Sequence, residues 1–431
     1  MRTVTGGRGR VTTGRRRGLP LLPLLPLLPL LPSLSLLAQQ PPCAPDNAGL
    51  TLPDGFCAVV VAEGLGRARH ITVAPNGDIL VAVPDRDSGG VRLLRDTNGD
   101  GTADFRVRLI QDPQAVDVQL RQAAGRSWIY YSTYREVIRY AWTPGTDSVS
   151  GPADTIVRGL AGARQHGMKT FTLADEGRLF VNLGAPSNSC QTDDRQAGSR
   201  GMDPCPLLDT TGGIWLFSAD RGGQNGSEGE RYATGLRNTV ALTVNPVDGE
   251  LYGVVHGRDA LGQLWGFTDS ANAETPAEEF HRIARGTNVG WPYCFFDPAI
   301  GRKILSPEYG GDGQAVGRCE SVAAPLVAFP AHWAPDGLHF YAGNQFPAAY
   351  RGGAFIAFHG SWNRAPLPQQ GFKIVFVPFS GTTPQAWQIF ADGFEAAGSR
   401  PVDVAEGPDG SLYVSDDRGG RVYRLFHRGP G

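Results

Sequence analysis

The stretch VALTVNPVDGELYGVV, from Val240 to Val255, is one copy of a unit that recurs along the chain. An apolar alternating run leads into a turn with glycine, and a second apolar run follows, which is the pattern of a β-hairpin. Related copies begin at Ile71, Val116, Phe171, Val240, His332 and Val402, with turn glycines Gly77, Gly125, Gly177, Gly249, Gly337 and Gly410. Six such repeats predict an all-β fold, a six-bladed β-propeller.

The repeats extend over residues 50–431, which we expect to form one propeller domain. A pair of β-sandwiches is the structural alternative, but sandwiches do not need similar hairpins spread over the whole length. No long helical periodicity competes with the strand pattern. Residues 39–49 are predicted to be a linker.

Residues 1–38 differ from the rest, because a basic stretch precedes a Leu-Pro run and no acidic residue is present. This is typical of a cleaved export signal, by the general or the twin-arginine route. Frequent prolines disfavour a membrane-spanning helix, so no stable span is expected in the mature chain. We therefore predict a periplasmic or secreted protein. The six arginines are Arg2, Arg8, Arg10, Arg15, Arg16 and Arg17.

The mature chain is acidic, because removal of six arginines leaves 34 basic against 42 acidic residues. This balance disfavours nucleic acid as a partner. Six cysteines fall into three close pairs, and an oxidising compartment favours disulfides over free thiols. The predicted pairs are Cys43 with Cys57, Cys190 with Cys205, and Cys294 with Cys319.

Basic residues stand directly before several of the repeated strands, where a propeller chain enters the channel at its axis. Examples are Arg69, Arg164, Arg237 and Arg400. Cations that converge from different blades repel one another unless an anion lies among them, so this set predicts a small polyanionic ligand. The alternative is that each arginine pairs with a local carboxylate at the surface.

Four strings resemble the signature segments of the sorbosone/glucose dehydrogenase family. They are GLRNTVALTVNP, GTNVGWPYC, HGSWNR and GSRPVDVAEGPDGSLYVSDDRGGRVYRL. The resemblance covers the whole mature chain. It implies that a pyrroloquinoline quinone lies across the channel mouth, with its carboxylates held by arginines and its quinone facing a calcium ion and a histidine.

The resemblance also implies roles for individual residues. The carbonyls of Gly257 and Arg258 align with the calcium ligands, although the family usually has proline where Arg258 stands. Val402 replaces a second cofactor-binding arginine, and a cofactor-binding lysine aligns near the end of HGSWNR. Together with Arg69 of the basic set, the predicted cofactor-binding residues are Arg69, Arg237, Asn238, Trp362, Asn363, Arg364 and Arg400.

Two histidines are candidates for the catalytic base. His166 matches the histidine of the glucose dehydrogenases, whereas His359 belongs to the HGSWNR string of sorbosone-type members. A neutral imidazole can accept the proton of a sugar hydroxyl as hydride leaves its carbon. The resemblance leaves both candidates open.

A separate loop carries oxygen ligands at alternate positions around glycine. Such an alternation suits a hard cation and predicts a structural calcium site. An Asp/Asn/Gly turn without metal is the alternative. The predicted ligands are Asp96, Asn98, Asp100 and Asp104.

These features predict a quinoprotein that oxidises an aldose or sugar aldehyde, with pyrroloquinoline quinone and calcium as cofactors. No CxxCH haem motif is present, so electrons must leave to an external acceptor, a quinone or a cytochrome. Two alternatives remain: a calcium-dependent hydrolase of the lactonase type, and a binding propeller without catalysis.

Overall fold

The computed structural model describes residues 9, 10, 12, 14, 41–162 and 165–429. The chain divides into two units, residues 1–39 and 40–431, and the second unit holds all the strands described below. Arg164 and nearly all of the predicted export signal lie outside the described residues.

The second unit is a six-bladed β-propeller, as the repeats predicted. Each innermost strand contacts the innermost strand of the next blade, and the sixth contacts the first, so the ring is closed. The innermost strands are β2 (Ile71–Val73), β6 (Asp117–Ala123), β10 (Phe171–Ala174), β15 (Ala241–Val244), β21 (Pro335–Phe340) and β27 (Pro401–Glu406).

Three further antiparallel strands complete each blade outward from the axis. The second strands are β3 (Ile79–Val83), β7 (Arg126–Ser132), β11 (Arg178–Leu183), β16 (Leu251–Val255), β22 (Ala354–Phe358) and β28 (Leu412–Asp416). The third strands are β4 (Gly90–Arg95), β8 (Val137–Ala141), β12 (Gly213–Ser218), β17 (Glu278–Ile283), β23 (Lys373–Val377) and β29 (Arg421–His427). The outer strands are β5 (Phe105–Gln111), β9 (Ser150–Arg158), β14 (Glu230–Thr234), β20 (Val327–Phe329), β26 (Gln388–Ala391) and β1 (Phe56–Ala62). The short β13 (Gln224–Asn225) adds to β9 in parallel.

The last blade takes its outer strand from the beginning of the domain. The N-terminal strand β1 pairs antiparallel with β29, so both ends of the domain lie in one sheet. Phe56 of β1 packs edge-on against Phe346 and Phe390, with ring centroids 4.8 and 5.0 Å apart. The β1–β29 pairing therefore closes the ring, and apolar packing of β1 joins the sixth blade to the fifth.

For one of the six glycines, the prediction that it lies in a turn is wrong. Gly337 lies inside the innermost strand β21, which pairs with β22, and the hairpin connection follows at residues 341–353. A Cβ at Gly337 would lie 2.5 Å from the Asp403 Cα, so glycine is required here by close approach of a neighbouring strand. The other five glycines lie in the hairpin turns, as expected.

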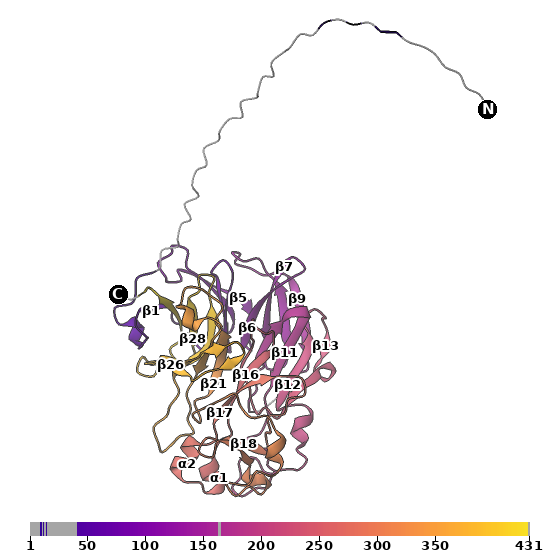
Figure 1. The fold of residues 1–431 in the computed structure, drawn as a ribbon, viewed down its shortest axis with the longest axis vertical. Coiled ribbons are helices and arrows are strands. Elements are labelled where there is room, and N and C mark those ends of the chain that lie inside the picture. The colour runs from indigo at the N-terminus through magenta and orange to yellow at the C-terminus, as the bar shows by residue number, and fades with distance from the viewer. Residues whose placement is uncertain (1–8, 11, 13, 15–40, 163–164, 430–431) are drawn as a thin grey trace, which may run out of the picture. The chain divides into compact units, whose positions relative to one another are not determined.

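Long insertions gather at one end of the propeller, where α1 (Leu261–Trp265), α2 (Asp269–Glu274) and β18 (Cys294–Asp297) lie together at the lower end of Figure 1. β18 pairs with β19 (Arg302–Leu305). β24 (Phe379–Ser380) and β25 (Thr383–Pro384) form a separate two-stranded sheet between β23 and β26 in the sequence. All three predicted disulfides are confirmed, and two of them are in these insertions. Covalent links therefore order segments that the blades do not contain.

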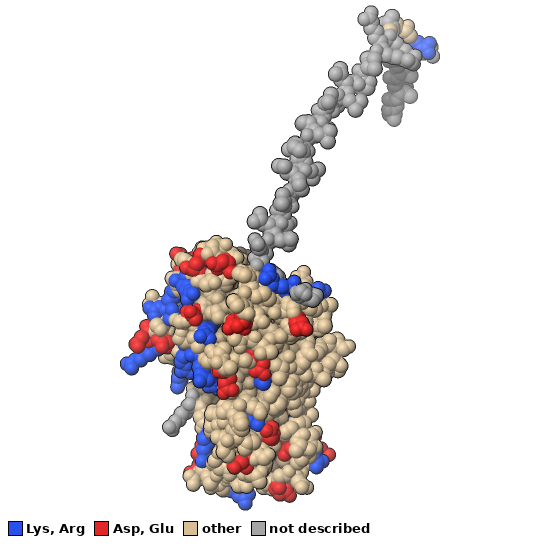
Figure 2. Space-filling view, turned by 90° about the vertical axis from the view of Figure 1, so that its left-hand side faces the viewer, with Lys and Arg blue, Asp and Glu red and all other residues tan. Residues whose placement is uncertain are grey.

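The surface carries charges of both signs. Figure 2 shows basic and acidic side chains interspersed on the face that it draws. Across the described residues, no helix combines the length and apolar character that a membrane crossing requires.

Substitution Phe56→Ala tests the closure of the ring. Removing a buried ring that contacts two other aromatic rings should cost about 3–5 kcal/mol of unfolding free energy. Denaturant unfolding of the wild type and the variant measures this loss. The control Val247→Ala changes a residue that is 61% exposed and should cost less than about 0.5 kcal/mol. Equal stability of the two variants would contradict the role given to β1.

Candidate active site

Asp336 is a buried carboxylate at the insertion-bearing end of the axis. It is the second residue of β21, and its Oδ2 atom lies 2.9 Å from the Arg69 guanidinium, which comes from the loop before β2. The His256 Nε2 atom, just after β16, lies 3.3 Å from Oδ1. The His359 Nδ1 atom, just after β22, lies 3.8 Å from Oδ2. Blades one, four and five thus meet at this carboxylate.

Asp417, after β28, joins the sixth blade to the same cluster. It accepts hydrogen bonds from Arg69 Nη1 and from His359 Nε2, each at 2.8 Å. Arg400, directly before β27, donates to the His359 carbonyl at 3.0 Å and to the Gly360 carbonyl. These contacts fix both the ring and the backbone of His359.

The cluster shifts the protonation of its members. Burial alone would raise the pKa of Asp336, but Arg69 and His256 hold it well below its usual range. Burial likewise opposes the ionisation of Asp417, yet His359 and Arg69 lower its pKa to about 2. Burial would lower the pKa of His256, but Asp336 and Glu278 raise it above its ordinary value. Both aspartates are therefore charged near neutral pH.

Arg237 is the centre of a second group of contacts. Its guanidinium donates to Asp259 Oδ2 at 2.8 Å, to the Gly257 carbonyl at 2.8 Å, and to both oxygens of Asn188. Arg195 binds the same Asp259 oxygen at 2.8 Å. Burial would raise the pKa of Asp259, but these two arginines lower it below its ordinary value.

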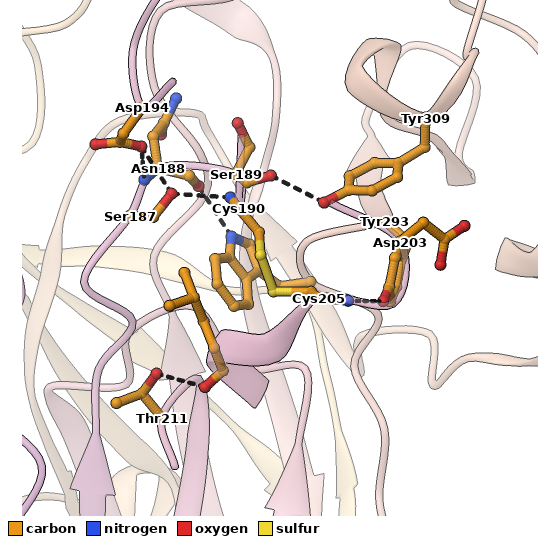
Figure 3. The surroundings of a disulfide bond; sticks show 12 residues. Ser187, Asn188, Ser189, Cys190, Asp194, Asp203, Cys205, Thr211, Tyr293 and Tyr309 are labelled. Atoms are coloured by element: carbon orange, nitrogen blue, oxygen red, sulfur yellow. Dashed lines mark hydrogen bonds between the residues drawn. A yellow bond between two sulfur atoms is a disulfide. The ribbon is translucent and has the colours of Figure 1, made fainter. Parts of the chain in front are cut away.

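The Cys190–Cys205 disulfide helps to hold the segment that carries Asn188 (Figure 3). Asn188 donates its backbone N–H to Asp194, and its carbonyl accepts from the Trp291 indole at 2.9 Å. The Cys205 N–H donates to the Tyr293 hydroxyl at 2.8 Å. Two insertions are therefore joined beneath Arg237.

His166 lies beside this group and is a neutral base. Its Nδ1 atom donates to the Ala185 carbonyl at 2.7 Å, so the lone pair is on Nε2. Burial, and then the charge of Arg237, lowers the pKa of His166 to about 3. Its backbone has a positive φ of 52°, a conformation that few residues other than Gly, Asn and Asp adopt readily.

The predicted arginines do converge, but most of them have protein partners. Arg69 pairs with carboxylates from distant parts of the chain and Arg237 pairs with Asp259, 22 positions away, in the buried interior and not at the surface. Arg400 has no ion pair within 41–162 and 165–429, and burial lowers its pKa against the opposing effect of Asp417. Asp259, Asp336 and Asp417 therefore compensate the charges of Arg69, Arg195 and Arg237.

Asn238 and the residues of the HGSWNR string differ in their placement. The Asn238 Oδ1 atom accepts from Asn182 at 3.2 Å and is buried beside Arg237 in the chain. Trp362 is 64% exposed. Asn363 is within 3.3 Å of the His332 ring, and Arg364 binds Glu274 and the Ala273 carbonyl of α2. The contacts of Asn363 and Arg364 therefore hold the α2 segment, whereas Trp362 remains accessible.

Arginine side chains bind the segment of Gly257 and Arg258, for which calcium binding was predicted. The Gly257 carbonyl accepts from Arg237, so a guanidinium already approaches this oxygen. The Arg258 side chain forms a buried ion pair with Glu308, which also accepts from Ser189 and Trp265. These contacts give no support to a cation here, and calcium at Gly257 and Arg258 stays a prediction.

The loop with Asp96, Asn98, Asp100 and Asp104 has the contacts of a closed turn. Asp96 accepts from the N–H groups of Gly99 and Gly101, each at 2.7 Å, and Asp104 accepts from Thr97. Asp100 accepts from the Thr102 N–H at 2.8 Å. Across the described residues, no group of three or more acidic, His or Cys side chains is arranged to hold a metal. The calcium prediction for this loop is not tested by these contacts.

Several members of the site were missed from the sequence. Asp336 lies next to Gly337, for which a turn was predicted, and Asp259, Asp417 and His256 lie after second strands, whereas the basic set was predicted before first strands. Lys169 was also missed: it is fully buried, its ammonium donates to the Gly167 carbonyl at 2.9 Å, and burial lowers its pKa to about 8. The residue after each second strand reaches the same end of the axis as the residue before each first strand, and these positions hold His256, His359 and Asp417.

Comparison with known proteins adds the family. The TrAA12-like family model matches residues 50–428. The chain belongs to the TrAA12-like family. Members of this family are related to pyrroloquinoline quinone-dependent sugar dehydrogenases, so the resemblance seen in the sequence is confirmed.

A pyrroloquinoline quinone-dependent pyranose dehydrogenase of Coprinopsis cinerea is 28% identical over 425 residues, with 87% of this chain and 54% of that protein covered. An uncharacterised protein of Borreliella burgdorferi is 33% identical over 206 residues, 46% of this chain and 49% of that protein. The chain spans about half the length of these curated relatives.

Solved structures share the fold. The family AA12 enzyme of Trichoderma reesei, in its iodide structure, has a TM-score of 0.72 at 22% identity, covering 88% of this chain and 97% of that one. The holo pyrroloquinoline quinone domain of the Coprinopsis cinerea pyranose dehydrogenase has a TM-score of 0.70 at 23% identity, covering 90% and 98%.

Substitution His166→Asn tests the environment of this neutral base, because Asn tolerates the positive φ. The unfolded chain binds a proton at His166 below about pH 6.5, whereas the folded protein binds it only near pH 3. Wild-type stability is therefore lost as the pH falls from 6.5 towards 3. Between pH 7 and pH 5, this loss should be smaller in His166→Asn by about 1–2 kcal/mol. Equal losses in urea unfolding of both proteins would contradict the described environment.

Proposed function

We propose that the protein is a quinoprotein oxidoreductase that oxidises an aldose or a sugar aldehyde at the insertion-bearing end of the propeller axis. Hydride passes to pyrroloquinoline quinone in this scheme. One observation carries the proposal: basic side chains from several blades meet two histidines at one place, and the Arg400 guanidinium there hydrogen-bonds only to carbonyls within the described residues and otherwise lies over the Phe372 ring. Membership of the TrAA12-like family and the Coprinopsis relative support it.

The donor set suits the quinone in part. This cofactor carries three carboxylates, and Arg400 offers them a half-buried guanidinium that has no ion pair within the described residues and whose pKa is lowered by burial. A carboxylate beside Arg400 would remove that penalty. Arg69 and Arg237 already have aspartate partners, so we assign them first to building the site and second to the electrostatic attraction of the cofactor.

His359 is the stronger candidate for the catalytic base. Its Nε2–H donates to Asp417, which orients the ring and leaves the lone pair of a neutral imidazole on Nδ1. Asp417 also stabilises the imidazolium that forms when Nδ1 accepts the hydroxyl proton. Hydride leaves the same substrate carbon for the quinone, which supplies the electron-accepting chemistry when bound.

His166 is the second candidate and differs from His359 in electrostatics. Within the described residues no carboxylate is bonded to its ring, and nearby Arg237 opposes a positive charge. We therefore assign His166 to binding and orientation of the substrate or cofactor, and proton acceptance to His359. In the neutral form, the lone pair is on Nε2 in His166 and on Nδ1 in His359, so each ring can accept a hydrogen bond at that atom.

Electrons must leave to an external quinone or cytochrome under this proposal, since no CxxCH motif is present. We further propose that the protein is exported. Three disulfides and a basic, Leu-rich segment before residue 39 support export, because disulfides persist in oxidising compartments.

Reconstitution tests the proposed reaction. Purified protein free of quinone should oxidise aldoses or sugar aldehydes only after pyrroloquinoline quinone and a divalent cation are added. A redox dye as acceptor measures the rate, and separate additions of calcium and magnesium test the metal. Activity with nicotinamide cofactors alone, or lactone hydrolysis without quinone, would contradict the proposal.

Substitutions at Arg400 and the histidines should separate binding from catalysis. Arg400→Ala should weaken quinone binding about tenfold or more, because a charge-assisted hydrogen bond is worth about 1.5–3 kcal/mol. His359→Ala should bind quinone nearly normally but lower kcat about a hundredfold. His166→Ala should have the smaller effect on kcat.

Quinone titration followed by absorbance, and steady-state rates, measure these effects. The control Arg126→Ala removes an exposed arginine at the start of β7, at the hairpin end of the blade, and should change neither quantity. Wild-type turnover in both histidine variants would contradict the proposed base.

A further inference from the structure

A cavity of about 260 Å³ runs along the axis of the propeller. All six innermost strands line it, from their first residues, such as Asp117 and Asp336, to their last, such as Glu406. A second recess of about 460 Å³ begins where this cavity ends, because both are lined by Leu120, Leu173 and Val244. The axis is therefore hollow from the candidate active site to the opposite face.

Besides Asp336, three titratable side chains line the end of this cavity that is nearest the candidate active site. The His70 Nδ1 atom lies 3.2 Å from Asp403 Oδ2, and Asp117 lines the cavity beside them. The His70 Nε2 atom is buried and has no hydrogen-bond partner within the described residues. A buried polar atom at a polar cavity is ordinarily satisfied by water, and one water needs only about 10–15 Å³ of such space. The cavity therefore has room for several waters.

Asp336 connects the cavity with the candidate base. It lines the cavity and also lies 3.8 Å from His359 Nδ1. Next to it, Gly337 allows Asp403 to approach, since an added Cβ would lie 2.7 Å from Asp403 Oδ1. At the far end, His339 and Glu406 form a pair at 3.2 Å, and the His339 side chain is 28% exposed. Titratable groups thus line both ends of the cavity, and water would have to bridge the stretch between them.

The charges around His70 favour a proton in this part of the cavity. Burial would lower the pKa of His70, but Asp117 and Asp403 raise it, against the smaller opposing effect of Arg69. Burial raises the pKa of Asp117 to about 6, although His70 and the Phe171 N–H oppose this. The cavity-lining residues of β10 and β15 include no titratable side chain. A proton is thus shared near neutral pH.

The proposed function, on which this step rests, creates a need for such a path. Oxidation of a CH–OH group sends hydride to the cofactor, turns the O–H electron pair into the C=O bond, and leaves the proton on the base. A bound quinone and sugar would cover the outer face of the site. Reoxidation of the cofactor by an external acceptor that takes only electrons would return both hydrogens of the substrate as protons, so two protons must leave the site in each turnover.

We propose that the axial cavity is a proton exit path, in which water, His70, Asp117 and Asp403 carry the substrate proton from the active site to the His339–Glu406 pair at the opposite face. No part of this path needs to touch substrate. Its residues are relay residues, and their loss should affect proton release without affecting hydride transfer.

Stopped-flow measurements with a pH-indicator dye test the path in the reconstituted enzyme, turning over with a one-electron acceptor that takes up no proton. Asp117→Asn keeps an oxygen for the Phe171 N–H, and Glu406→Gln lies at the exit, so the two changes act at opposite ends. In each, proton appearance should slow about tenfold, while the absorbance change of cofactor reduction keeps its wild-type rate. The control Asp147→Asn, at an exposed loop position, should change neither. Wild-type proton release in both variants would overturn the proposal.

A second measurement needs no sugar and no quinone. In nitrogen-15 histidine spectra of the protein without cofactor, the titration of His70 should move to lower pH in Asp117→Asn. The substitution removes the Asp117 charge, which raises the pKa of His70. An unchanged titration would overturn the proton-sharing cluster. Absence of sugar oxidation in the wild type, with the shift still present, would instead contradict the proposed function and support the cluster.

Discussion

Arg69 connects the first blade with the last two, and the axial end of the molecule is built around it. Its two terminal nitrogens bind Asp336 on the fifth blade and Asp417 on the sixth. Burial opposes the charge of Arg69, but the two aspartates raise its pKa above its ordinary value. Removing one partner of a buried ion pair leaves the other charge uncompensated. This loss costs more free energy of folding than the intact pair contributes. The ring and the site therefore depend on the same contacts.

Charge compensation also determines the properties of the two candidate histidines. The carboxylates that neutralise Arg69 are the ones that contact His359, so the cation is held and the imidazole is oriented by a single pair of side chains. A similar arrangement joins Arg237 to Asp259 near His166, but there the arginine lowers the basicity of the histidine. Two histidines in one site thus acquire different properties from opposite neighbouring charges.

The sequence predicted the propeller well because a hairpin repeat is a local pattern, in which apolar alternation and turn glycines lie within about 16 residues of each other. The three disulfides were predicted for the same reason. Gly337 was misread because its cause is not local: the neighbouring strand with Asp403 requires it. Partners of the arginines could not be predicted either, since Arg69 meets Asp417 across 348 positions of sequence. The basic set indicated an anion, and the structure adds that aspartates of the chain supply much of the negative charge.

The family places the chain among related propellers, while the charges of this chain's own residues carry the account of its function. The most direct test is a crystal structure of the protein soaked with pyrroloquinoline quinone. The account predicts density for the quinone at the insertion-bearing end of the axis, with a carboxylate within hydrogen-bonding distance of Arg400 and the reactive ring facing His359. Quinone density at another surface, or none at saturating concentration, would contradict it.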